Sequence, residues 1–154
     1  MTPRHEIFEI LLVEDNLADI TLVREALKQQ SIPCNLHVIQ DGAKAIAFLQ
    51  QPDDSQTPRL DLVLLDMHLP KCDGDEILHA LRATVRNART PVIVMTSSVA
   101  PRDRATAERH SALHCFAKPA SLDGFMQLGV MVRDVLLKTT IGPDGSYVTG
   151  GGTA

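Results

Sequence analysis

The sequence has few cysteines and no pattern that would put them to use. The three that it contains are far apart and form no Cys-x-x-Cys pair: Cys34, Cys72 and Cys115. This spacing predicts neither a disulfide framework nor a zinc site. We therefore expect reduced thiols in a cytosolic protein.

Long apolar runs and clusters of positive charge are also missing. No apolar run approaches the roughly 20 residues of a membrane-spanning helix, and the opening MTPRHEIFE lacks the apolar core of a signal peptide. Lys and Arg are scattered along a chain with a formal net charge of -4, whereas phosphate backbones attract clustered cations. These absences predict a cytoplasmic protein that binds neither membranes nor nucleic acid.

The most informative stretch runs from residue 60 to residue 74, LDLVLLDMHLPKCDG. Its first half is almost continuously apolar and ends on Asp66, which is typical of a central strand covered by helices on both faces. A carboxylate at that point lies beside the crevice where open α/β sheets bind ligands. Taken alone, Asp66 could equally be a turn or helix-cap residue.

The rest of the chain alternates short apolar runs with segments of helical spacing. Further strands are expected at 8–13, 35–39, 91–95 and 113–117, and helices after Asn16, Asp41, Gly74, Ala100 and Ser121, the last over 122–138. The alternation predicts an α/β fold with a doubly wound, five-stranded parallel sheet and right-handed crossovers. One folded domain over 9–138 would be flanked by an N-terminal tail, 1–8, and a flexible, Gly- and Thr-rich C-terminal tail, 139–154.

Polar residues stand at the carboxyl ends of these strands, which are neighbours in a doubly wound sheet. They are Glu14, Asp15, Asp66, Thr96 and Lys118. Three carboxylates so close together would repel one another and would either take up protons or bind a cation, and Mg²⁺ prefers such oxygen ligands. The set suits phosphoryl transfer, with Asp66 as the nucleophile and with Lys118 and the Thr96 hydroxyl contacting phosphoryl oxygens.

The motifs LLVEDN, VLLDMHLPKCDG, VIVMTSS and FAKPAS resemble, in order and spacing, the receiver domain of two-component response regulators. The resemblance covers about residues 9–138 and implies a flavodoxin-like fold with strand order 2-1-3-4-5. It implies Glu14 and Asp15 as the acidic metal pair, Asp66 as phosphoacceptor, and the backbone carbonyl of His68 as a further ligand of Mg²⁺ or Mn²⁺. Thr96 matches the switch hydroxyl and Lys118 the phosphate-binding lysine.

Three positions depart from the family pattern or lie where family members vary. Cys115 stands where receivers carry an aromatic switch residue, so either the strand slips to present Phe116 or the coupling to Thr96 works differently. His68 and Ser98 each lie two residues beyond a motif residue. We expect the pair to help set the lifetime of the phosphoryl group by controlling the approach of water; the alternative is an exposed loop histidine without effect.

The family resemblance also suggests partners. The run from Val13 to Gly42 looks most like single-domain regulators that partner phytochrome-type sensor histidine kinases, whose phosphohistidine would be the donor. We expect a phosphoacceptor with intrinsic self-phosphorylation and autodephosphorylation rather than an enzyme, acting through protein contacts or a phosphorelay. Leu128, Met131 and Val135 on the last helix predict a homodimer patch; alternatively that helix is simply buried more deeply.

Three rival readings use the same residues. A haloacid dehalogenase-type phosphatase also has a strand-end Asp, but its DxD pattern is broken by His68. A flavin carrier of this fold would place a phosphate beside Glu14 and Asp15, which would repel it. A degenerate receiver that binds partners without phosphorylation is the more serious alternative, because Cys115 shows that parts of the switch have changed.

Overall fold

A five-stranded parallel sheet forms the centre of the molecule. The structure, a computed structural model, describes residues 7–52, 57–97, 100–141 and 147–149. The sheet strands are β1 (Phe8–Val13), β2 (Cys34–Ile39), β3 (Leu62–Asp66), β6 (Val92–Thr96) and β7 (His114–Ala117). They lie in the order β2-β1-β3-β6-β7, which is the predicted order 2-1-3-4-5 once the sheet strands are counted along the chain. The predicted α/β class and strand order are confirmed.

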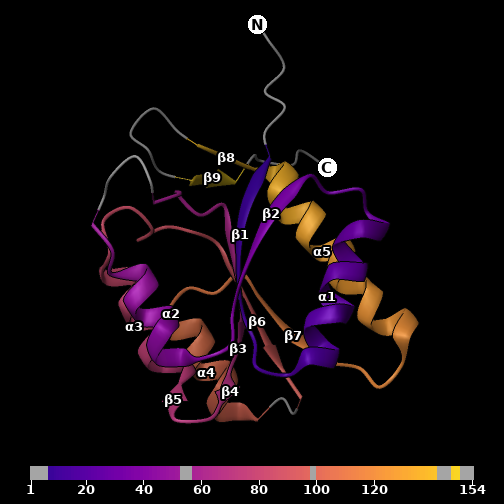
Figure 1. Cartoon of the computed structure of the whole chain (residues 1–154), viewed down its shortest axis with the longest axis horizontal. Helices are drawn as coiled ribbons and strands as arrows, with labels where there is room; N and C mark the ends of the chain where they lie inside the picture. The colour runs from indigo at the N-terminus through magenta and orange to yellow at the C-terminus, as the bar shows by residue number, and fades with distance from the viewer. Residues whose placement is uncertain (1–6, 53–56, 98–99, 142–146, 150–154) are drawn as a thin grey trace, which may run out of the picture.

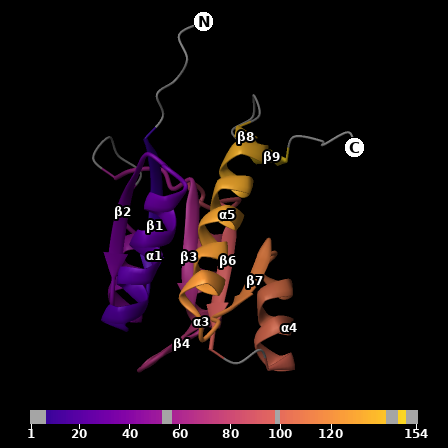
Figure 2. The same ribbon diagram turned by 90° about the vertical axis from the view of Figure 1, so that its right-hand side faces the viewer.

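Helices cover both faces of this sheet, as expected for a doubly wound fold. Helices α1 (Leu17–Gln29) and α5 (Leu122–Lys138) lie on one side, and α2 (Gly42–Leu49), α3 (Gly74–Ala83) and α4 (Pro101–Arg109) lie on the other (Figure 1). Figure 2 shows α1 and α5 side by side in front of the strands. Among the described residues, no helix is long and apolar enough to cross a membrane.

Capping residues fix where two of the helices begin. The Asn16 side chain accepts hydrogen bonds from the amides of Ala18 and Asp19 at 2.9 and 3.1 Å. Ser121 Oγ accepts one from the Gly124 amide at 3.0 Å. These bonds satisfy donors that a helix leaves without partners in its first turn. Helix α1 therefore starts directly beyond β1, and its first turn lies at the carboxyl edge of the sheet.

The predicted dimer patch on α5 is wrong as a surface feature. Leu128 and Val135 are only 0% and 4% exposed, and Met131 is partly buried against the same core. Helix α1 covers them: at Gly129 a Cβ atom would lie 2.2 Å from the carbonyl oxygen of Ala26. The alternative of a more deeply buried helix is therefore the correct one, and α1 supplies the packing partner that α5 has besides the sheet.

Two short antiparallel pairs were not expected from the sequence. Strands β4 (His68–Leu69) and β5 (Cys72–Asp73) pair just beyond β3, across a turn in which Lys71 has a φ of 69°. Strands β8 (Thr139–Ile141) and β9 (Tyr147–Thr149) pair within the segment predicted as a flexible tail. The domain boundaries at residues 9 and 138 stay predictions.

Candidate functional site

The ends of four sheet strands bring the predicted site residues to one edge. Glu14 follows β1, Asp66 ends β3, Thr96 ends β6 and Lys118 follows β7. The register pairs Asp66 with Met95 and Thr96 with Ala117, so these ends lie level with one another. Carboxylate oxygens of Glu14, Asp15 and Asp66 all lie within 4.8 Å of one another. Asp15 is exposed, whereas Glu14, Asp66 and Thr96 are buried.

Lys118 lies at the centre of this group. Its Nζ donates to Glu14 Oε2 at 2.7 Å, to Asp19 Oδ2 at 2.8 Å and to Asp66 Oδ2 at 3.2 Å, and its side chain is 8% exposed. The Lys118 amide also donates to the carbonyl of Thr96 at 2.8 Å, which fixes the end of β7 against β6. The side chain therefore bridges β1, α1 and β3.

Asp19 is a site residue that the sequence analysis missed. It lies in the first turn of α1, where an acidic side chain also interacts favourably with the helix dipole. Its position in the first turn of a helix that begins at the functional edge is the signal that could have identified it. The contact with Lys118 joins residues that are 99 positions apart in the chain, so no local motif contains it.

Burial and charge act against each other at this site. Burial raises the pKa of Glu14 to about 7, and the nearby charge of Asp66 adds to the rise, although hydrogen bonds from Lys118 and the Asn16 amide oppose it. Burial also disfavours the charge on Lys118. Its hydrogen bonds to Asp19 and Glu14 and the charge of Asp66 outweigh that effect and hold the pKa of Lys118 above its usual value. The lysine is therefore a fixed positive charge.

The donor set fits a hard divalent cation. Lys118 contacts the carboxyl groups of Glu14, Asp19 and Asp66, and Asp15 lies close to Glu14 and Asp66, so four acidic side chains share one ammonium group. Oxygen ligands from a few carboxylates, completed by water, are what Mg²⁺ uses in proteins. Glu14, Asp15 and Asp66 are the residues that would hold the ion. The proposed contribution of the His68 carbonyl rests on the family resemblance and stays a prediction.

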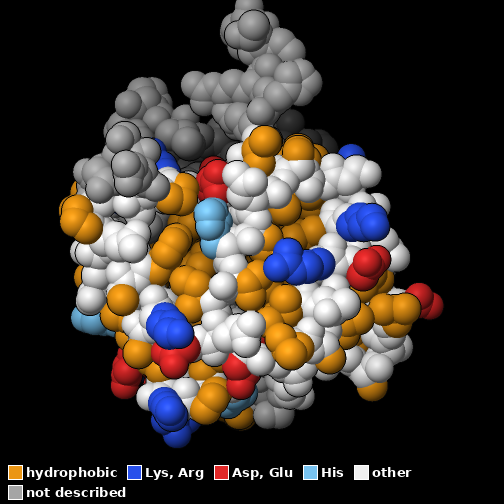
Figure 3. All heavy atoms as spheres, in the orientation of Figure 1, with side chains coloured by type: hydrophobic (Ala, Val, Ile, Leu, Met, Phe, Trp, Pro, Cys, Tyr) orange, Lys and Arg blue, Asp and Glu red, His pale blue; other side chains and the backbone are white. Residues whose placement is uncertain are grey.

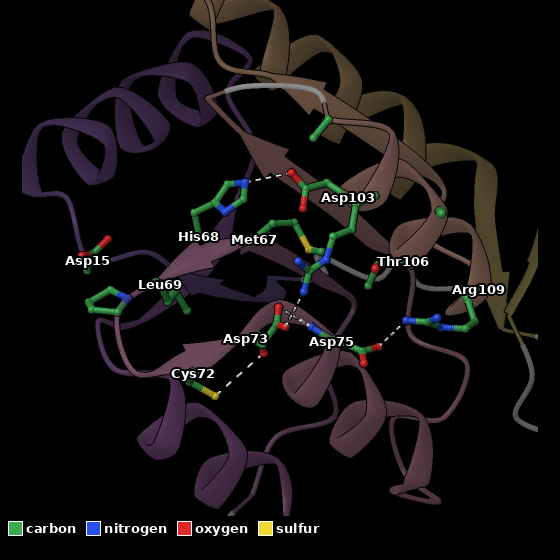
Figure 4. Close-up of a pocket in the computed structure, with 14 residues that line it drawn as sticks. Asp15, Met67, His68, Leu69, Cys72, Asp73, Asp75, Asp103, Thr106 and Arg109 are labelled. Carbon is green, nitrogen blue, oxygen red and sulfur yellow. Dashed lines mark hydrogen bonds and ion pairs between the residues drawn. The ribbon is translucent and has the colours of Figure 1, made fainter.

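His68 connects Asp66 to helix α4. Its amide donates to Asp66 Oδ1 at 3.0 Å, and its imidazole Nε2 lies 2.8 Å from Asp103 Oδ2 (Figure 4). Asp103 is mostly buried, and the His68 side chain is about half exposed. The sequence analysis did not identify Asp103, because it lies 35 positions further along the chain in a polar helix. Ser98 lies outside the described residues.

The structure decides between the two alternatives for the switch position. Cys115 pairs with Val94 in register, and it packs with the core on the face that α4 covers. Phe116 points to the opposite face, where its ring meets that of Phe125 edge-on at 5.8 Å. The strand has not slipped, so Cys115 occupies the place of the family's aromatic residue.

An open groove of about 1200 Å³ runs from the acidic site along α4. Asp15 and His68 lie at one end, and Arg109 extends from α4 towards Asp75 (Figure 4). Arg109 pairs with Asp75 at 3.0 Å, and Arg102 lies 4.0 Å from Asp73. Together with the contact between His68 and Asp103, these two ion pairs join the segment after Asp66 to helix α4.

Comparison with known proteins gives a consistent assignment. The family model described as response regulator receiver domain matches residues 10–128. Response regulator Rcp1 of Synechocystis is 47% identical over 90 residues, covering 58% of this chain and 61% of Rcp1. The crystal structure of Mn²⁺-bound Rcp1 superposes with a TM-score of 0.75 at 35% identity, covering 88% of this chain and 99% of that one.

Two further solved structures extend the comparison. The phosphorylated cyanobacterial phytochrome response regulator RcpA has a TM-score of 0.76 at 31% identity, covering 92% of this chain and 99% of that chain. The receiver domain of the sensor histidine kinase PA1611 from Pseudomonas aeruginosa, with magnesium in its active-site cleft, has a TM-score of 0.62 at 26% identity, covering 82% and 97%. The predicted resemblance, including that to phytochrome-associated regulators, is confirmed, and the chain belongs to the response regulator receiver domain family.

Proposed function

We propose that this chain is a single-domain response regulator that accepts a phosphoryl group on Asp66 from a phosphohistidine of a sensor histidine kinase. The observation that carries the proposal is the position of Lys118 Nζ, which binds Asp66 and Glu14 together at the carboxyl edge of the sheet. That arrangement unites a nucleophile, a fixed positive charge and an acidic cluster suited to a divalent cation.

The chemistry follows from the positions of these groups. A carboxylate oxygen of Asp66 forms the new bond to phosphorus, the phosphorus–nitrogen bond to the donor imidazole breaks, and that imidazole takes up a proton. A divalent cation, when bound, neutralises charge on the phosphoryl oxygens. Lys118 and the Thr96 hydroxyl contact the remaining oxygens. The His68 amide and Lys118 hold one carboxylate oxygen each, which fixes the orientation of Asp66 before transfer.

The same site accounts for the other proposed activities. Small acyl phosphates would donate to Asp66 without a kinase, because binding and orientation come from the site itself. Water attack on the resulting acyl phosphate would release inorganic phosphate and regenerate the carboxylate. His68, held by Asp103 beside Asp66, would limit the approach of that water, with Ser98 as the second proposed modulator.

The phytochrome-type kinase is proposed from the similarity to RcpA. Protein rather than nucleic acid is the proposed downstream partner, since Lys and Arg side chains lie apart on the face seen in Figure 3. We also propose a cytoplasmic location, supported by free thiols at Cys34, Cys72 and Cys115. A degenerate receiver remains the second candidate, because Cys115 occupies the α4-facing switch position.

Intact-mass measurement after incubation with acetyl phosphate and Mg²⁺ tests the proposal. We expect a single, labile adduct with the mass of one phosphoryl group, absent from Asp66→Asn and from samples treated with a chelator. Asp123→Asn is the matched control, because it neutralises an exposed carboxylate on α5 that does not belong to the acidic cluster. Absence of the adduct from the wild type would favour the degenerate receiver.

A further inference from the structure

Asp19 makes the second-shortest of the three contacts to Lys118, yet the proposed phosphoryl transfer does not use it. Its Oδ2 accepts from Lys118 Nζ at 2.8 Å, and its side chain is 22% exposed. The Asp19 amide is held in turn by the Asn16 cap at 3.1 Å. The carboxylate therefore projects from a fixed point on α1 towards the end of β7.

The three carboxyl groups that contact Lys118 differ in whether they would also bind a cation. Glu14 and Asp66 belong to the acidic cluster that would hold a cation, whereas Asp19 does not. An ion coordinated by that cluster competes with Lys118 for the oxygens of Glu14 and Asp66. Asp19 lies outside that cluster, so its oxygen would stay available to Lys118 when the cluster holds an ion.

The geometry of the ammonium group allows Asp19 to stay bound during transfer. An ammonium has three N–H donors, and Asp19 Oδ2 occupies one of them. The other two, which point towards Glu14 and Asp66 in this structure, are then available to phosphoryl oxygens. Lysine carries this group on a flexible four-carbon stem, so a partner outside the metal cluster restricts where Nζ can lie.

We propose that Asp19 is a positioning residue that holds Lys118 Nζ at the cleft while Glu14 and Asp66 engage the cation and the phosphoryl group. The inference rests on the proposed function and deepens it. It makes the first turn of α1 part of the phosphoryl-transfer site. A purely structural Asp19 would instead affect folding alone, and a metal-directed Asp19 would affect the Mg²⁺ requirement.

The test compares initial rates of phosphorylation by acetyl phosphate, followed by intact mass, across a series of Mg²⁺ concentrations. At saturating Mg²⁺ we expect Asp19→Ala to be slower by about tenfold, the effect of losing one hydrogen bond between charged groups. Asp19→Asn keeps an acceptor oxygen and should lose less, about threefold. The Mg²⁺ concentration for half-maximal rate should stay within about twofold of the wild-type value, because the cation ligands are unchanged.

Glu25→Ala is the matched control, since it removes one exposed carboxylate from the same helix. Its rate should equal that of the wild type. The inference is overturned if Asp19→Ala matches or exceeds the wild-type rate, if Glu25→Ala shows the same loss, or if added Mg²⁺ restores the rate. Should Asp19→Ala fail to fold, an unchanged rate in Asp19→Asn overturns it. A wild type that takes up no phosphoryl group rejects the proposed function instead.

Discussion

The imidazole of His68 and the carboxylate of Asp103 lie 2.8 Å apart and join the segment beyond Asp66 to helix α4. The same histidine donates its amide to Asp66. His68 therefore links the carboxylate of Asp66 to α4 through a backbone contact on one side and a side-chain contact on the other.

This contact predicts the effect of His68 on the lifetime of the phosphoryl group. Removal of the imidazole in His68→Ala opens the space beside Asp66 to water, so the adduct should be lost several-fold faster. Asp103→Ala should shift the lifetime in the same direction, because it releases the imidazole. The decay of the adduct by intact mass, after removal of acetyl phosphate, measures both. If His68→Ala loses the adduct at the wild-type rate, the His68 imidazole does not control the lifetime of the phosphoryl group.

The close crossing of α1 and α5 predicts a sensitive glycine. In Gly129→Ala the new Cβ would lie 2.2 Å from the backbone oxygen of Ala26, an atom that cannot rotate away. The helices must therefore separate, and we expect a loss of about 1–3 kcal/mol in the free energy of unfolding. Urea unfolding followed by circular dichroism measures the change.

Val130→Ala is the control for this substitution, since Val130 neighbours Gly129 on α5 but is 46% exposed. It should unfold within about 0.5 kcal/mol of the wild type. Equal stability of Gly129→Ala and the wild type would show that the two helices are less tightly packed than the structure indicates.

The contacts of Asp75 predict that part of the free energy of unfolding is lost at acid pH. Hydrogen bonds from His110 at 2.6 Å and Arg109 at 3.0 Å hold the pKa of Asp75 below its ordinary value of 3.8. Because the pKa of Asp75 is lower in the folded state than in the unfolded state, its contacts stabilise the folded protein at any pH above 3.8. This stabilisation is lost as the pH falls from 3.8 through the lower pKa of the folded state.

The measurement compares urea midpoints of wild type and Asp75→Asn. We expect the wild type to be more stable near neutral pH, with the difference shrinking as the pH falls to 3.8 and below. Asp123→Asn, which removes an exposed carboxylate in the first turn of α5, is the control for the substitution and should change the urea midpoint little. A difference that is constant with pH would contradict the assignment of the effect to Asp75.

The three thiols should differ in reactivity. Burial, assisted by the hydrogen bond to Glu76 and by nearby carboxylates, raises the pKa of Cys72 to about 11. At pH 8 only about one molecule in a thousand would then carry the reactive thiolate. Cys34 and Cys115 are less buried, so Cys72 should be alkylated last by iodoacetamide. Peptide mass spectrometry gives the order, and early labelling of Cys72 would contradict it.

Much of the fold could be predicted because its signals are local. The apolar run that ends on Asp66, the Asn16 cap and the spacing of 122–138 each fix an element from neighbouring residues. The parallel arrangement then brings the strand ends together, which is why Glu14, Asp15, Asp66 and Lys118 could be expected in one place.

The missed features depend on contacts between distant elements. The contacts of Asp19 with Lys118 and of His68 with Asp103 join residues that are 99 and 35 positions apart, so they exist only in the folded tertiary structure. Leu128 and Val135 formed a second apolar stripe in the sequence, but its partner was α1 rather than another chain. Periodicity shows that a helix face is apolar without showing what covers it.

The central claim is that Asp66 accepts phosphorus in a cation-dependent reaction. Borohydride reduction of the acetyl phosphate-treated protein converts an acyl phosphate into an alcohol, and trypsin then releases the peptide from Leu60 to Lys71, between Arg59 and Cys72. We predict reduction at Asp66 alone, only when Mg²⁺ is present. Reduction at Asp61 or elsewhere, or a yield at Asp66 that does not depend on Mg²⁺, would contradict the account.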